Sequence, residues 1–221
     1  ARTQVQGYID ELVETHGFSR MALEEVFAQA SKQERIIELM SRPAERRLVW
    51  HEYRKILVDD PRVSQGIIFW RENEAALERA AKIYGVAPEI IVAIIGVETR
   101  YGRIMGNFGV VDALSTLAFD YPPRAEFFRG QLTQHFLLSR EEGKNPLSMQ
   151  GSYAGAMGFG QFIPSSYRAY AVDFDGDGVR DIWANKTDAI GSVANYFAEH
   201  GWRGAEGVVE RVTLGDETSE L

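Results

Sequence analysis

The sequence predicts a mainly α-helical protein, and three observations support that fold class. Apolar residues recur three or four positions apart along most of the 221-residue chain, which is helical spacing. Residues that begin or end helices, chiefly serine, glycine and proline, separate these stretches. No alternating apolar pattern of useful length indicates a β-strand, and only residues 151–162 leave room for a loop or a short β-hairpin.

The first 85 residues are predicted to form a helical supporting domain of five helices. The expected helices are residues 5–15, a stretch capped by Ser19, a stretch capped by Ser31, residues 45–58 and residues 67–84. We expect Asp60-Pro61 to end the fourth helix, because proline has no N–H to donate. Gly85 is expected to end the fifth.

The second half, residues 86–202, is predicted to be a separate and functional domain, because glycines become frequent and loops lengthen there. Helices remain the expected elements, at residues 88–101, 110–119, 125–142, 164–172 and 186–200. The acidic tail, residues 203–221, has only a weak pattern and receives no assignment.

Composition excludes several classes of protein. The net charge of -8 leaves no basic surplus to neutralise phosphates, so nucleic acid is not an expected partner. The absence of cysteine excludes disulfides, thiolate nucleophiles, cysteine-ligated zinc and a lipid-anchor cysteine. No apolar stretch is long enough to predict a transmembrane helix. The first residues do not read as a signal peptide, and a secreted protein whose signal had been removed would look the same.

Glu98 ends the most apolar run of the chain, residues 88–97. Burial among apolar neighbours raises the pKa of a carboxyl group, and a carboxyl that stays protonated can act as a general acid. Enzymes that break glycosidic bonds need such a group. The alternative is structural, with Glu98 paired to Arg100 or Arg103.

The glycine-rich stretch between residues 151 and 162 could approach a ligand closely through its backbone. It lacks the Lys-Ser/Thr ending of a phosphate-binding loop. The side chains of Ser152 and Gln161, interleaved with aromatic rings, are suited to binding a sugar. The alternative is a structural hairpin whose aromatic side chains lie in the core.

An acidic loop that begins at Asp173 matches the start of an EF-hand calcium loop. Ligand positions one, three, five and seven are Asp173, Asp175, Asp177 and the backbone carbonyl of Val179. Position twelve, normally a bidentate glutamate, is Ala184, so the last ligand would be Asp188 or Asp181. We expect calcium that braces the fold, against the alternative of an unliganded acidic loop.

The histidines and tryptophans show no spacing that predicts a site. We expect the histidines at the surface or at helix ends: His16, His51, His135 and His200. We expect the tryptophans in the core: Trp50, Trp70, Trp183 and Trp202.

Five motifs in a fixed order resemble one family. They are residues 96–102 (GVETRYG), 121–126 (YPPRAE), 151–167, the loop at residue 173, and 190–197 (IGSVANYF). Together they closely resemble the B-type bacterial lytic transglycosylases of glycoside hydrolase family 103. The resemblance covers most of the chain up to Trp202.

The resemblance implies a lysozyme-like catalytic core with a short β-hairpin, an EF-hand-like calcium loop and the helical supporting domain. It implies non-hydrolytic cleavage of the MurNAc-β-1,4-GlcNAc bond of peptidoglycan, which leaves 1,6-anhydroMurNAc ends. Glu98 aligns with the family's single catalytic acid and base. A second carboxylate is not required if the substrate's acetamido group stabilises the cationic centre.

Further positions of the family motifs carry over to this chain. Ser152, Gln161 and Tyr196 match residues that line the cleft, while Tyr53 and Arg124 match more distant glycan contacts. The calcium ligands would be Asp173, Asp175, Asp177, Val179 and Asp188. No cofactor is expected for catalysis, the expected partners are peptidoglycan strands, and the expected location is the periplasm.

Two rival functions are kept. One is a calcium-dependent peptidoglycan-binding protein without catalysis, and the other is a muramidase that hydrolyses the same bond. The lack of a second well-placed carboxylate in the sequence pattern disfavours an inverting hydrolase.

Overall fold

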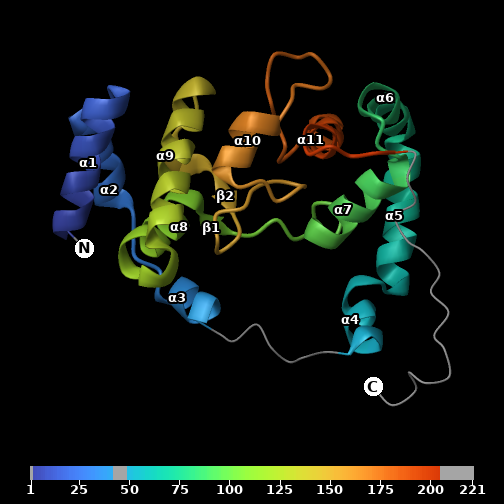
Figure 1. Cartoon of the computed structure of the whole chain (residues 1–221), viewed down its shortest axis with the longest axis horizontal. Coiled ribbons are helices and arrows are strands. Elements are labelled where there is room, and N and C mark those ends of the chain that lie inside the picture. The colour runs from blue at the N-terminus through green and yellow to red at the C-terminus, as the bar shows by residue number, and fades with distance from the viewer. Residues whose placement is uncertain (1, 42–48, 205–221) are drawn as a thin grey trace.

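Helices account for most of the computed structural model, which describes residues 2–41 and 49–204 (Figure 1). The α-helices are α1 (Arg2–His16), α2 (Arg20–Gln29), α3 (Glu34–Ser41), α4 (Trp50–Leu57), α5 (Asp60–Glu72), α6 (Glu74–Tyr84), α7 (Pro88–Thr99), α8 (Val110–Asp120), α9 (Ala125–Glu141), α10 (Pro164–Tyr170) and α11 (Lys186–Glu199). Two short 3-10 helices are η1 (Pro122–Arg124) and η2 (Pro146–Ser148). The strands are β1 (Phe108–Gly109) and β2 (Gln150–Gly151).

One side of the molecule is built around the contact between α8 and α9, with α10 packed on α9. Helices α1 and α2 lie outside this pair (Figure 1). The Tyr8 hydroxyl lies 2.9 Å from that of Thr133 on α9, and the Tyr8 ring meets the edge of Phe119 on α8. Aromatic packing therefore attaches the N-terminal helices to the α8–α9 pair.

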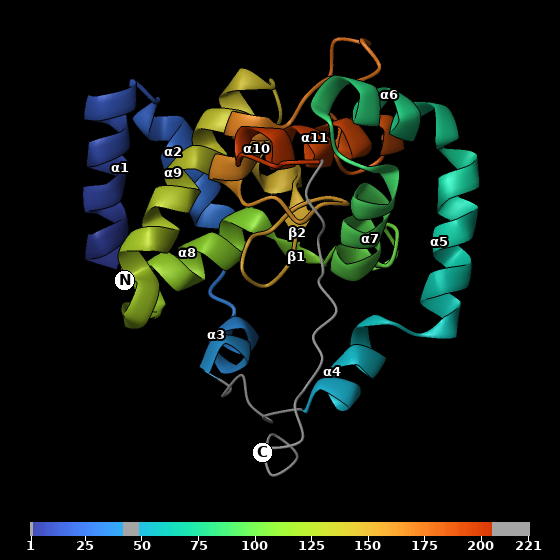
Figure 2. The ribbon, with the colours of Figure 1, turned by 45° about the vertical axis from the view of Figure 1, so that its right-hand side comes forward.

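The other side is built around α7, which contacts α5, α6 and α11. Figure 2 shows α5 standing at the edge of this side, across the molecule from α1. Helix α11 also packs along α6, so a helix near the C-terminal end of the described chain joins α5, α6 and α7 on this side.

The division at residue 85 stays a prediction. The helices before it lie on both sides of the molecule, α1 to α3 against α8 and α9, and α5 and α6 against α7 and α11. Buried apolar side chains form one cluster that runs from Tyr8 to Ala194.

Several predicted helix limits are confirmed, and one predicted cap is wrong. Ser19 caps α2 by accepting a hydrogen bond from the N–H of Ala22. Ser31 does not cap α3, which begins three residues later; its own N–H donates to the carboxylate of Asp112 at 2.8 Å. A contact 81 residues away in sequence therefore replaces the expected local one.

The region of α4 to α6 also differs from its prediction. Residues 45–48 of the fourth expected helix lie outside the described residues, and α4 begins at Trp50. Asp60-Pro61 begins α5 instead of ending α4, because Asp59 caps α5 and proline suits the first helical turn. The expected helix over residues 67–84 is divided at Asn73 into the second half of α5 and the whole of α6.

The strands pair antiparallel, Phe108 with Gly151 and Gly109 with Gln150. They are far apart in sequence, so this sheet is not a hairpin. Within residues 151–162, the predicted hairpin is reduced to one antiparallel bridge between Met157 and Phe162.

Two exposure predictions were wrong. His135 is completely buried, and its Nε2 lies 2.9 Å from the carbonyl oxygen of Pro146. Burial lowers the pKa of His135 to about 4, which keeps the ring neutral at physiological pH. Trp50 is 72% exposed, and its ring lies 6.3 Å from that of Tyr53.

No single helix within residues 2–41 and 49–204 has both the length and the apolar composition needed to cross a membrane. Helices α6 and α7 pass that test only as a pair, and they meet at a bend of 114°.

The Tyr101 ring packs between α5 and α7 because two glycines make room for it. A Cβ at Gly66 on α5 or at Gly96 on α7 would lie 2.5 Å from the Tyr101 hydroxyl oxygen. Since the ring is confined from both helices and also packs near Phe69, it has little freedom to move aside. This contact positions the turn that follows α7.

We predict that Gly96→Ala lowers the free energy of unfolding by about 1–3 kcal/mol, because the added methyl overlaps the Tyr101 ring. The control is Gly130→Ala on α9, where a Cβ would meet nothing within 4 Å. That change is expected to stabilise by roughly 0.5–1 kcal/mol, since alanine is the better helix former. Urea unfolding measures both, and equal stability of the two variants would contradict the packing described.

Candidate active site

The last turn of α7 carries Glu98 at the surface of the molecule. Pro88 stands in the first turn of this helix, where its missing N–H costs nothing. The face that includes Ile91 and Ile95 is buried in the core. Glu98 instead points to the exposed side, one turn after the partly buried Ile94. The helix is thus anchored by its apolar face and presents one carboxyl group.

The turn after Glu98 has an unusual backbone. Arg100 and Tyr101 have φ angles of 50° and 60°, and Gly102 has φ 85°. Positive φ is uncommon for residues with side chains and costs of order 1 kcal/mol or more. Surrounding contacts must therefore hold the chain in this path.

Thr99 provides one of these contacts. Its buried hydroxyl lies 3.1 Å from the carbonyl oxygen of Ile95 and 3.0 Å from that of Phe159, and it accepts a hydrogen bond from the N–H of Gly102. The residue next to Glu98 therefore connects the end of α7 to the glycine-rich loop.

An ion pair provides the second contact. The guanidinium of Arg100 lies 2.9 Å from the carboxylate of Asp59, the residue that caps α5. Arg62, on the first turn of α5, donates to the carbonyl oxygens of Ile56 and Leu57 at the end of α4. The turn after Glu98 is thereby joined to the start of α5, and α5 to α4.

These contacts decide the pairing of Glu98. Arg100 is engaged by Asp59, and no hydrogen bond or ion pair joins Glu98 to any residue within 2–41 and 49–204. The alternative in which Glu98 pairs with Arg100 or Arg103 is therefore not observed among the described residues. Partial burial raises the pKa of Glu98 above its ordinary value, and no cation in the described part of the chain opposes that shift.

Glu98 lies in a pocket of about 340 Å³ between α7, the glycine-rich loop, α10 and α11. Its lining includes Ile94, Glu98, Gln161, Phe162, Tyr196 and Phe197. Three of the predicted site residues, Glu98, Gln161 and Tyr196, are thus brought together. Among the described residues that line this pocket, Glu98 carries the only carboxyl group.

Gln161 and Tyr196 are both held in place. Gln161 has φ 51°, and its amide nitrogen donates to the carbonyl oxygens of Met105 and Gly158. The Tyr196 ring stacks on His200 at 4.0 Å and meets the edge of Tyr170. One wall of the pocket therefore presents an oriented amide and another an aromatic ring.

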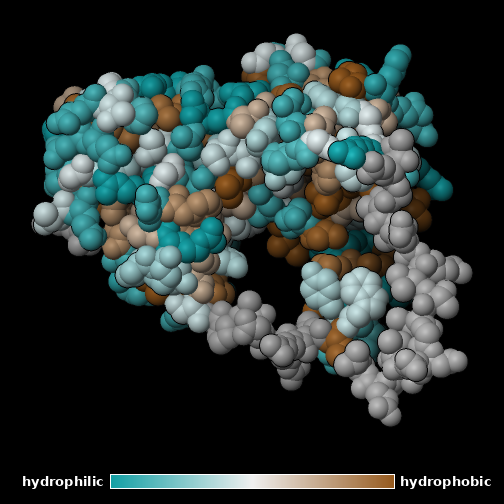
Figure 3. Space-filling view, in the orientation of Figure 1, coloured by the Kyte–Doolittle hydropathy of each residue, from teal (hydrophilic) through white to brown (hydrophobic). Residues whose placement is uncertain are grey.

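The other three predicted contacts do not line this pocket. Ser152 follows β2, and its hydroxyl accepts hydrogen bonds from the N–H groups of Ala154 and Ala156. Tyr53 lies on α4, about half exposed, and Arg124 lies at the start of α9 over the Phe127 ring. Figure 3 shows an opening between the two sides of the molecule, the side built around α8 and α9 and the side that includes α5 and α7.

Sequence reasoning missed several residues of the site. Ser166 and Phe197 line the pocket, and Thr99 and Asp59 hold the turn after Glu98. Thr99 and Phe197 had a local signal, since they directly follow the predicted site residues Glu98 and Tyr196.

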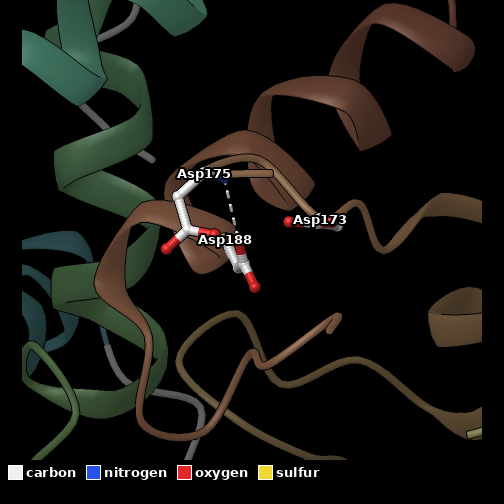
Figure 4. Close-up of side chains that lie close together, drawn as sticks. All are labelled: Asp173, Asp175 and Asp188. Carbon is white, nitrogen blue, oxygen red and sulfur yellow. Dashed lines mark hydrogen bonds between the residues drawn. The ribbon is translucent and has the colours of Figure 1, made fainter. Parts of the chain in front are cut away.

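The acidic loop brings part of its predicted ligand set together. Oxygen atoms of Asp173, Asp175 and Asp188 lie within 4.8 Å of one another (Figure 4). Oxygen ligands suit calcium, and three carboxylates at this spacing repel one another without a cation. Asp177 lies outside this group and accepts a hydrogen bond from the N–H of Val179.

Asp188 is the buried member of the cluster. It stands in the first turn of α11, and its carboxylate accepts hydrogen bonds from the N–H groups of Phe174, Asp175 and Asp181. Burial raises the pKa of Asp188, and these backbone N–H groups oppose the shift. Asp188 therefore fixes the shape of the loop against α11.

The sequence matches the family described as "Transglycosylase SLT domain" over residues 1–221, and the chain belongs to that family. One relative is membrane-bound lytic murein transglycosylase B of Escherichia coli (strain K12), 50% identical over 206 residues. The match covers 89% of this chain but 57% of the relative, so the chain spans little more than half of that protein's length.

Solved structures agree with the fold. Soluble lytic transglycosylase SltB1 from Pseudomonas aeruginosa is 54% identical with a TM-score of 0.91, over 92% of this chain and 69% of that one. E. coli lytic transglycosylase Slt35, solved in complex with calcium, is 50% identical with a TM-score of 0.87, over 92% and 64%. SltB3 from P. aeruginosa, solved with NAG-anhNAM-pentapeptide, is 34% identical with a TM-score of 0.84, over 93% and 54%. The mainly α, lysozyme-like fold is thereby confirmed.

Proposed function

We propose that this chain is a peptidoglycan lytic transglycosylase, which cleaves the MurNAc-β-1,4-GlcNAc bond and leaves a 1,6-anhydroMurNAc end. The observation that carries the proposal is the unpaired Glu98, whose pKa is raised, in a pocket with Gln161 and Tyr196. Family membership and the names of the relatives support the same reaction.

Glu98 would act twice in this reaction. Its carboxyl first donates a proton to the bridging oxygen as the bond from that oxygen to the muramoyl C1 breaks. Its carboxylate then takes the proton of the C6 hydroxyl, whose oxygen forms the new bond to C1. Atoms balance without water, and Glu98 ends protonated as it began.

The single carboxyl in the pocket agrees with that scheme. Hydrolases of the common two-carboxylate types need a second carboxyl group about 5–10 Å from the first. Here the cationic centre would be stabilised by the carbonyl oxygen of the substrate's own acetamido group. Gln161 and Tyr196 would orient that sugar through the amide and the aromatic ring.

The remaining predicted contacts would act farther along the glycan. Ser152 directly follows β2. Because β2 pairs with β1, the first strand after Glu98 in the sequence, Ser152 lies next to this two-stranded sheet. Tyr53 on α4 and Arg124 at the end of η1 would hold more distant sugars of the glycan. These assignments rest on the family motifs and on the exposure of both side chains.

We further propose that calcium binds the acidic loop through Asp173, Asp175, Asp177, the Val179 carbonyl and Asp188. The clustered oxygens and the calcium complex of Slt35 support this site. The ion would neutralise the carboxylates and brace the loop against α11, the helix that carries Tyr196. It would have no step in the chemistry.

Peptidoglycan lies outside the cytoplasmic membrane, so we place the protein in the periplasm. The E. coli relative is named for binding a membrane and for acting on murein.

Glu98→Gln is expected to fold normally and to release no anhydro-muropeptides from purified cell walls, because an amide cannot donate or accept the required proton. The control, Glu89→Gln, changes an exposed carboxyl in the first turn of the same helix and should keep activity. Mass spectrometry of the products measures both.

The same spectra separate the rival functions. Reducing ends from the wild type would indicate a muramidase. Wall binding without any released product would indicate a binding protein, and normal anhydro product from Glu98→Gln would remove Glu98 from the mechanism.

Calcium at 100 times its dissociation constant is expected to stabilise the protein by about 2.7 kcal/mol. For a chain of this length that raises the thermal midpoint by roughly 5–10 °C. Asp175→Asn should lose most of that rise, whereas the control Asp60→Asn, at the exposed start of α5, should keep it. Differential scanning calorimetry with calcium or with a chelator tests this, and an unchanged wild-type midpoint would contradict the site.

A further inference from the structure

A second pocket, of about 420 Å³, lies between α3, β1 and the start of α8. Its lining is mainly polar: Gln33, Arg35, Asn107, Phe108, Gly109 and Asp112. Helix α3 lies below α8 in both views of the ribbon (Figures 1 and 2). None of the residues assigned above to catalysis, glycan binding or calcium lines this pocket.

One stretch of chain connects the two pockets. The amide of Gln161, in the Glu98 pocket, donates to the carbonyl oxygen of Met105. Asn107, in the second pocket, follows only two residues later, which is a reach of at most about 7 Å of extended chain. The intervening Gly106 has φ 90° and lies so close to β2 that a Cβ would be 2.1 Å from the Gly151 carbonyl oxygen. The path between the pockets is therefore short and closely packed against β2.

The second pocket presents an unengaged cation. Arg35 is exposed, and among residues 2–41 and 49–204 its guanidinium has no ion pair or hydrogen bond. Asp112 does not neutralise it, because the Asp112 carboxylate already accepts hydrogen bonds from the Ser31 N–H, the Ser31 hydroxyl and the Gln33 amide. The exposed Asn107 amide adds a further donor.

A guanidinium and an amide in one pocket suit a carboxylate, which the guanidinium can bind through two hydrogen bonds. In peptidoglycan the muramoyl sugar carries a peptide, and that peptide has free carboxylates. The peptide leaves the strand at the sugar whose C1 is attacked beside Glu98. A carboxylate on it could then reach a pocket one short stretch of chain away.

We propose that this second pocket, built on Arg35 and Asn107, binds a carboxylate of the peptide attached to the muramoyl sugar. The inference rests on the proposed function and narrows its substrate to peptide-bearing strands. Since Asp112 would repel an anion placed against it, the carboxylate lies toward Arg35 and Asn107. The pocket thus acts on substrate preference and has no role in the proton transfers.

The test compares two substrates, peptide-bearing glycan strands and the same strands after an amidase has removed the peptides. For Arg35→Gln, the ratio of kcat/KM on the first to that on the second should fall about tenfold, the effect expected from losing one charged hydrogen bond. Arg35→Glu should lower it further, and salt should reduce the wild-type ratio by screening. The control is Lys82→Gln, the same charge change on the exposed face of α6, which should leave the ratio unchanged.

The outcomes separate the two proposals. If the wild type yields anhydro products from neither substrate, the proposed function fails. If it yields them and Arg35→Gln leaves the ratio unchanged, the peptide pocket is overturned. An equal loss on both substrates would also overturn it, because it would assign Arg35 to the sugar or to its lactyl carboxylate, which the amidase leaves in place. Thermal midpoints equal to that of the wild type establish that the variants are folded.

Discussion

The ion pair between Arg100 and Asp59 is the contact on which the site depends. Arg100 stands two residues after Glu98, close enough in sequence to pair with it, and such a pair would lower the pKa of the acid. Asp59 draws that guanidinium away, while the turn takes positive φ angles at Arg100 and Tyr101. Glu98 is left beside apolar side chains at the C-terminal end of α7, where the helix dipole also disfavours a negative charge.

The fold supplies this contact by joining distant parts of the chain. Asp59 belongs to the junction of α4 and α5, and the Tyr101 ring packs against Gly66 and Gly96 in adjacent helices. Thr99 attaches the same turn to the glycine-rich loop. Helices from the first part of the chain therefore shape the surroundings of Glu98, even though none of them lines its pocket.

The sequence alone was sufficient for the features whose causes are local. The apolar run of α7, the glycine-rich loop and the acidic loop predicted a helical protein with Glu98, Gln161 and a carboxylate cluster. Contacts between residues far apart in sequence were missed. They are the hydrogen bond of Ser31 to Asp112, the ion pair of Arg100 with Asp59, and the packing that buries His135 completely. No periodic pattern encodes such contacts, because each depends on how separate helices pack.

The pKa of Glu98 is the most direct test of this account, and a carboxyl-carbon NMR titration measures it. The account predicts a value above the ordinary 4.5 in the wild type, with the acid form extending to higher pH. It also predicts a lower value in Asp59→Asn, where Arg100 is released to approach Glu98. A wild-type value at or below 4.5 would show that Glu98 is paired or fully hydrated, and would contradict the account.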